Sequence, residues 1–178
     1  MSTALPYMLA FCRIAVGLVF AVSFGGKVLD IPAFEQTIAR FRLLPHRASR
    51  LAALMFLGSE MVVVALMSAG GHLLGLGFGL ATLLLLTFCV ALISALVRHV
   101  DTSCNCFGTS ERAVSTLDIW RNVALSACTL GGCGLLAASD GEQGILGAAN
   151  WVLVGLAAAM FVAAWTHLGE IARLFWQG

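Results

Sequence analysis

The chain has 178 residues, of which 60% are hydrophobic and only 11% are charged. A soluble domain of average composition is about a quarter charged, so the 10 cationic and 9 anionic side chains are too few to cover a soluble globule. The formal net charge of +1 offers no cationic surface to a nucleic acid. The composition therefore predicts an integral membrane protein whose main solvent is the lipid bilayer.

Because a helix crosses the hydrocarbon core in about 20 residues, the apolar segments predict five spans within a single membrane domain. They cover approximately residues 5–24, 52–68, 73–97, 119–138 and 145–167. The first segment has no basic region before it and contains Arg13, which indicates a retained span rather than a cleaved signal. The predicted fold is all-α, a polytopic transmembrane bundle with a four-helix core. A four-span bundle, with the first polar stretch dipping into the membrane, stays open.

Residues 30–44, between the first two spans, carry apolar side chains at helical spacing. Ile31, Phe34, Ile38, Phe41 and Leu44 recur every three or four positions, and charged side chains fill the remaining face. This pattern predicts an amphipathic helix that lies in the membrane interface.

The cationic residues lie on one side of the predicted bundle. With five spans, the first polar stretch, the loop of residues 98–118 and the C-terminal tail share a side, which holds nine of the 10 Lys and Arg residues. Cytoplasmic loops carry the excess of cations. We therefore expect a multi-pass protein of the cell inner (plasma) membrane with its N-terminus outside and the 98–118 loop and C-terminus in the cytoplasm.

Two charged residues, Arg13 and Glu60, fall inside predicted spans. Counted from the uncharged side at about 1.5 Å per residue, Arg13 lies roughly 12 Å deep and Glu60 roughly 13 Å deep. A lone charge at that depth is costly and needs a partner. We therefore predict an Arg13–Glu60 ion pair, which would either fix the register of two helices or polarise a bound head group or relay a proton.

Residues 98–118 form a polar loop that contains Cys104 and Cys106. A Cys-x-Cys pair closes only a small strained ring, which suits an exchangeable dithiol. Cations at Arg98, Arg112 and Arg121 can stabilise a thiolate there, and His99 is a candidate proton-transfer group. Two close thiolates also suit a soft metal ion such as Cu(I), Zn(II) or Hg(II), and two idle thiols are the third alternative.

The other four cysteines, Cys12, Cys89, Cys128 and Cys133, fall within predicted spans. Small apolar filling is their expected role. Cys12 and Cys133 have similar depths, so a second redox pair there is the alternative.

Several motifs together match a known pattern. The sequence resembles the DoxX/MauE superfamily in Arg13-x3-Gly17-x2-Phe20, Gly25-Gly26-Lys27-Val28-Leu29-Asp30, Phe41-x-Leu43-Leu44-Pro45 and Glu60. It resembles MauE more narrowly in Cys104-x-Cys106-Phe107-Gly108 followed by Leu117-Asp118-x2-Arg121-Asn122. The resemblance covers roughly residues 10–125.

The resemblance implies a bundle of four or five spans engaged in thiol redox work. Cys104 and Cys106 would then be the redox pair, with Arg13, Glu60 and Arg121 as polar residues of the family pattern. It also implies a thioredoxin-like partner, or a client with exchangeable thiols, and a membrane quinone as electron acceptor. We expect the quinone near Phe107 and Trp120, because its ring stacks on aromatic side chains. The resemblance further implies that the protein accompanies a thioredoxin-like partner in maturing a disulfide-rich periplasmic dehydrogenase, which would place the thiols outside, against the charge bias.

The working hypothesis is therefore a membrane thiol–disulfide oxidoreductase or redox maturation factor. The alternative is a protein that transports or delivers Hg(II) or Cu(I) with the same two cysteines. A third hypothesis is a scaffold for a thioredoxin-like partner in which the cysteines are silent.

Overall fold

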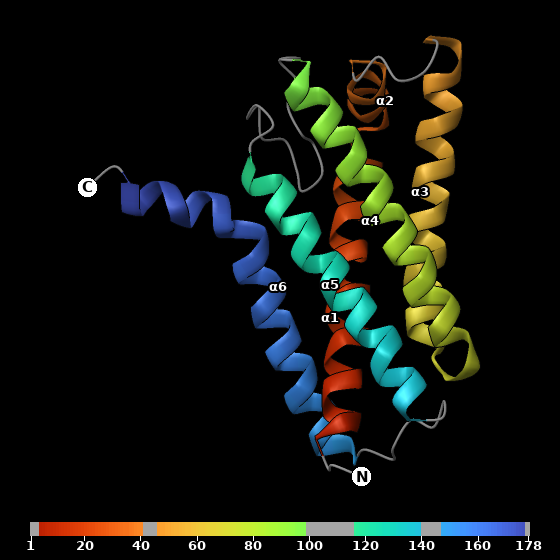
Figure 1. Ribbon diagram of the computed structural model, residues 1–178, viewed down its shortest axis with the longest axis vertical. Helices are drawn as coiled ribbons and strands as arrows, with labels where there is room; N and C mark the ends of the chain where they lie inside the picture. The colour runs from red at the N-terminus through yellow and green to blue at the C-terminus, as the bar shows by residue number, and fades with distance from the viewer. Residues whose placement is uncertain (1–3, 41–45, 99–115, 140–146, 177–178) are drawn as a thin grey trace.

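The computed structural model describes residues 4–40, 46–98, 116–139 and 147–176 and confirms the predicted all-α fold. The elements in chain order are α1 (Leu5–Val28), α2 (Ile31–Arg40), α3 (His46–Ala69), a 3-10 turn η1 (Gly71–Leu73), α4 (Leu74–Val97), α5 (Thr116–Ala138) and α6 (Ala148–Trp176) (Figure 1). In the described part of the chain, four segments are long and apolar enough to cross a membrane: Leu5–Val28, Ala48–Ala69, Gly71–Val97 and Ala148–Thr166. The chain is therefore a multi-pass α-helical membrane protein.

Four helices form the core of the bundle, as predicted. α1 packs against α3, α3 against α4, α4 against α5, and α5 returns to α1, so the four make a closed ring. α6 packs on the outside of α1, and Figure 1 shows its C-terminal part bending away from the bundle. α5 occupies the place of the fourth expected span, but polar residues such as Arg121 and Asn122 leave it outside the apolar set. Five spans therefore stay a prediction.

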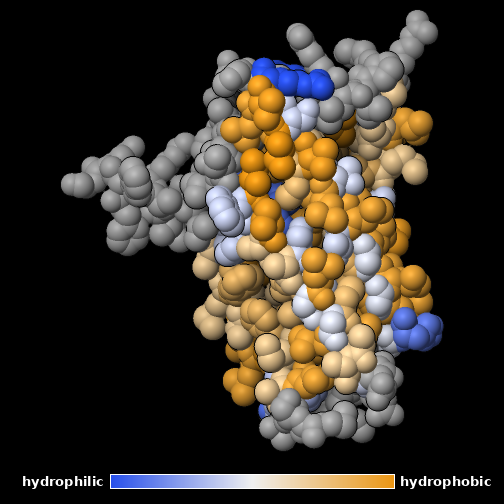
Figure 2. All heavy atoms as spheres, viewed as in Figure 1, coloured by the Kyte–Doolittle hydropathy of each residue, from blue (hydrophilic) through white to orange (hydrophobic). Residues whose placement is uncertain are grey.

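The outer surface of the bundle is apolar along its length. Figure 2 shows hydrophobic side chains over most of the visible face, with a strongly hydrophilic group at the upper end. On α4, Leu76, Leu83 and Val90 are 62–65% exposed and recur at intervals of seven residues. Such a row faces the lipid, because a water-facing surface of this kind would favour aggregation.

The amphipathic helix α2 covers the end of the bundle where α1 finishes and α3 begins (Figure 1). Asp30 starts it, because its Oδ1 accepts a hydrogen bond from the Ala33 N–H at 3.0 Å. Phe34 is buried against Ala53 and Leu57 of α3, with Ile31 and Ile38 beside it. The predicted apolar face is thus confirmed for residues 31–38; positions 41–44 lie outside the described residues.

A close approach between α4 and α5 depends on Gly132. A Cβ atom added there would lie 2.6 Å from two ring atoms of Phe78, and Phe78 is fully buried. Because the ring has no free space to enter, the two helices can pack this closely only while position 132 lacks a side chain.

Gly132→Ala is therefore expected to lower the free energy of unfolding by about 1–3 kcal/mol. Gly131→Ala is the matched control, because a Cβ at Gly131 meets nothing within 4 Å. Alanine there is expected to be neutral or to stabilise by up to about 1 kcal/mol through helix propensity. Unfolding in mixed detergent micelles measures both variants. Equal stability of the two would contradict the described packing of α4 on α5.

Candidate functional site

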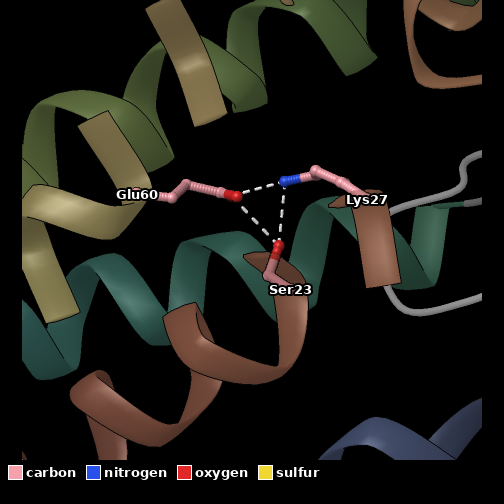
Figure 3. A network of polar contacts seen from close by, with 3 residues as sticks. All are labelled: Ser23, Lys27 and Glu60. Carbon is pink, nitrogen blue, oxygen red and sulfur yellow. Dashed lines mark hydrogen bonds and ion pairs between the residues drawn. The ribbon is translucent and has the colours of Figure 1, made fainter. Parts of the chain in front are cut away.

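Three polar side chains meet inside the four-helix core. Glu60 of α3 forms an ion pair with Lys27 of α1 through its Oε1 atom. Ser23, one turn before Lys27, donates its hydroxyl to the same Oε1 at 3.0 Å and accepts a hydrogen bond from Lys27 Nζ at 2.8 Å. Figure 3 shows the resulting triangle, with Glu60 reaching across from α3. Lys27 is 3% exposed and Glu60 2%, so the cluster is buried.

Aromatic rings surround the Lys27 ammonium. Its Nζ atom lies 4.8 Å from the ring centre of Phe56, 5.1 Å from that of Phe34 and 5.9 Å from that of Phe88. These rings come from α3, α2 and α4. A cation within about 6 Å of a ring face is attracted by the ring quadrupole, most strongly where water is excluded. The rings therefore stabilise the charge on Lys27 independently of Glu60.

The two carboxylate oxygens of Glu60 differ in their hydrogen bonds. Both contacts of the carboxylate fall on Oε1, and Oε2 is buried without a hydrogen-bond partner among the described residues. Leaving a buried acceptor unsatisfied costs about 1–3 kcal/mol, and more for a charged group. An atom of this kind calls for a donor that the described residues do not supply.

A cavity of about 40 Å³ adjoins the cluster and is lined by residues of all four core helices. Its polar lining consists of Ser23, Lys27, Glu60 and Asn122, and the remaining lining is apolar. A water molecule needs roughly 10–15 Å³ of such space and two or more polar partners. The cavity therefore has room for about three water molecules, and it is too small for a quinone ring in this arrangement of side chains.

The predicted Arg13–Glu60 ion pair is wrong, because Glu60 pairs with Lys27. Arg13 instead donates through Nε to the Met67 carbonyl at 2.6 Å and through Nη2 to the Ser68 carbonyl at 2.8 Å. These carbonyls lie seven and eight residues beyond Glu60, about two turns further along α3. Helix C-termini leave such carbonyls without intrahelical donors. Arg13 therefore serves the end of α3, not its buried carboxylate.

The same arginine holds three segments together. Its guanidinium lies 5.6 Å from the ring centre of Trp151 on α6, and a Cβ at Gly70 would come within 2.6 Å of its nitrogens. Gly70 has a φ of 69°, a conformation that glycine adopts without strain. Arg13 thus joins α1 to the end of α3 and to α6.

Arg13→Met is expected to lower the free energy of unfolding by about 2–4 kcal/mol, because two charge-assisted hydrogen bonds are lost. Arg50→Met removes a cation from an exposed position on α3 and is the matched control. Chemical unfolding in detergent micelles compares the two. If Arg13→Met cost no more than Arg50→Met, the described anchoring role would be refuted.

Two cysteines within the bundle are neighbours. Cys12 of α1 lies beside Cys128 of α5, and both pack against the main apolar core. The sequence instead suggested Cys133 as the alternative partner of Cys12. All three are free thiols in this structure.

Residues 5–138, which include the four core helices, match the family described as methylamine utilisation protein MauE. The chain belongs to the MauE family. It is also 29% identical over 162 residues to the methylamine utilization protein MauE of Paracoccus denitrificans, and the aligned region covers 87% of each chain. No solved structure matches it.

The predicted redox residues of this MauE-family protein lie in the loop between α4 and α5, within the family match. Cys104, Cys106, Phe107, His99 and Arg112 are outside the described residues. The two helices that bound the loop are described, and they enter it at the same end of the bundle as α2 (Figure 1).

Two further predicted residues of the MauE-family chain lie near the start of α5. Arg121 is buried; its Nη2 donates to the Thr166 carbonyl of α6 at 3.3 Å, and its Nη1 lies 3.9 Å from Asp118 Oδ1. Trp120 is 70% exposed and does not line the cavity. Arg121 therefore connects α5 with α6, whereas the Trp120 ring is exposed on the surface of α5.

Sequence reasoning missed Lys27 and Ser23 as site residues. The first span was expected to end at Phe24, which placed Lys27 outside the membrane, but α1 continues to Val28. A signal was available: Ser23 and Lys27 are four residues apart and so lie on one face of a helix. A lysine on the same face as a serine, one turn beyond it, is a candidate partner for Glu60.

Proposed function

We propose that this MauE-family protein is a membrane thiol–disulfide oxidoreductase or redox maturation factor that acts in methylamine utilisation. The observation that carries the proposal is the sequence Cys104-Asn105-Cys106-Phe107-Gly108, a Cys-x-Cys motif between α4 and α5 and within the family match. A disulfide between two such cysteines closes a small strained ring, which favours exchange. The name of the Paracoccus denitrificans relative supports the pathway. The charge bias supports a cytoplasmic loop in the plasma membrane, and thiol labelling from each side of the membrane tests that orientation.

The proposed exchange takes place at the two loop cysteines. A thiolate of a thioredoxin-like partner or client attacks one sulfur of the Cys104–Cys106 disulfide, so that the S–S bond breaks and a mixed disulfide forms. The second thiolate of the partner then attacks the mixed disulfide. The partner leaves oxidised, and Cys104 and Cys106 remain as a dithiol, which gives up two electrons and two protons when its disulfide re-forms.

The electron acceptor that we propose is a membrane quinone. The described cavity is too small for its ring, so the residues proposed to hold it are Trp120 and Phe107. Exposure of Trp120 supports this choice, because a quinone dissolved in the bilayer reaches an exposed ring of α5 laterally. When bound there, a quinone supplies a two-electron, two-proton acceptor.

Vesicles that contain the purified protein test the proposal. A reduced thioredoxin-like dithiol and a short-chain quinone are added, and quinol formation is followed by absorbance. We expect one quinol for each partner disulfide formed. Quinone reduction no faster than in protein-free vesicles would overturn the proposal.

A further inference from the structure

Glu60 lines the cavity, and its carboxylate has one oxygen bound by the described residues and one that is not. Ser23 and Lys27 both bind Oε1, while Oε2 has no protein donor in the described part of the chain. Glu60 and Asn122, from α3 and α5, line the same cavity. Water in the cavity would have Glu60 and Asn122 among its polar partners.

This division between the two oxygens has a chemical consequence. A proton added to Oε2 leaves both contacts at Oε1 in place, so the cluster need not rearrange when Glu60 changes charge. The rings of Phe34, Phe56 and Phe88 surround the Lys27 ammonium and attract it independently of Glu60. The described groups around the cavity include no other titratable side chain: α1 contributes Lys27, α3 contributes Glu60, and α4 and α5 contribute apolar residues and Asn122.

The cavity is also close to the loop that carries the thiols. Asn122 lies six residues after the start of α5, and Phe88 lies ten residues before Arg98 at the end of α4. At about 1.5 Å per residue, roughly 10–15 Å of helix separates the cavity from the ends of the loop. Lys27 is in the last turn of α1, at that same end of the bundle.

We propose that Glu60, held by Lys27 and Ser23, is a proton-exchange site that takes up and returns protons at Oε2 through water in the cavity. Its purpose rests on the proposed function: two thiols lose two protons for each disulfide formed, and a quinone needs two protons for each quinol. Glu60 carries one proton at a time: a hydronium in the cavity gives its proton to Oε2 and becomes water, and Oε2 later returns the proton to a water molecule. It is unchanged after each transfer and gains no electron.

Infrared difference spectroscopy of the full chain in vesicles tests the site without relying on turnover. Lowering the pH is expected to produce a protonated carboxyl band that shifts in D₂O and is missing in Glu60→Gln. Glu35→Gln, the same substitution on α2 away from the cavity, is the matched control and should retain the band. Absence of a Glu60 band at any pH that the fold withstands would overturn the proposal.

Turnover gives the second readout. Glu60→Gln keeps an oxygen that Lys27 and Ser23 can bind, and it is expected to slow quinone-linked thiol oxidation at least tenfold and to flatten its pH profile. Asn122→Leu removes one polar partner for cavity water with the Lys27–Glu60 pair in place, and should also slow turnover if Glu60→Gln fails to fold. Unchanged rates and pH profiles in both variants would overturn the proposal. A Glu60 band in a protein without thiol oxidation would support the site and reject only the proposed function.

Discussion

Replacing either Cys104 or Cys106 with serine is expected to reduce quinone-linked thiol oxidation to the rate of protein-free vesicles. A serine hydroxyl cannot form the disulfide that accepts electrons from the partner, so neither variant can complete the redox cycle. Cys89→Ala is the matched control, because it removes a buried thiol of α4 that has no place in the proposed exchange. Quinol formation in vesicles measures all three variants.

The same cysteine variants separate the competing functions. A soft-metal carrier would show stoichiometric Hg(II) or Cu(I) binding that both serine variants lose, with no thiol-dependent quinone reduction. A scaffold would retain its effect on client maturation when the cysteines are replaced. Full activity of Cys106→Ser would reject the proposed thiol exchange outright.

Breaking the Lys27–Glu60 pair from one side is expected to have the largest effect on stability. Lys27→Met or Glu60→Met alone should lower the free energy of unfolding by about 3–5 kcal/mol, because each leaves a buried charge without its partner. The double variant replaces both charges with apolar side chains of similar length, and often such a replacement is close to neutral. We therefore expect the second substitution to restore most of the stability that the first removes.

A double-mutant cycle in detergent micelles measures this coupling. Glu60→Met is expected to be the milder single change, because it leaves the Lys27 ammonium among three aromatic rings. Arg40→Met, at an exposed position on α2, is the control for loss of a cation. Additive losses in the double variant would show that the two charges do not interact as described.

Composition and periodicity predicted the class of fold and most of its helices. The paucity of charge requires a bilayer, and the spacing from Ile31 to Ile38 reproduces the face that α2 packs on α3. Apolar length also locates α4, which matches the predicted span 73–97 to within one residue. It locates α3 too, but α3 begins earlier than the predicted span because polar residues continue the helix beyond the hydrocarbon core. His46–Arg50 is such an extension, at the start of α3.

The partners of the charged residues could not be predicted from composition or periodicity. Depth places Arg13 and Glu60 at one level, but depth says nothing of how helices rotate about their axes or which other groups compete. Arg13 finds two carbonyls at the end of α3, and Lys27 reaches Glu60 because α1 is one turn longer than expected. Both outcomes depend on contacts between segments more than 30 residues apart.

The loop cysteines are predicted by motif alone, since Cys104 and Cys106 lie outside the described residues. Their redox state in native membranes tests the central claim most directly. Cysteines are reduced, a quinone is added, and remaining thiols are alkylated and counted by mass spectrometry of the loop peptide. We expect Cys104 and Cys106 to become a disulfide within the turnover time only when quinone is present. Two alkylated thiols in the presence of quinone would contradict the account.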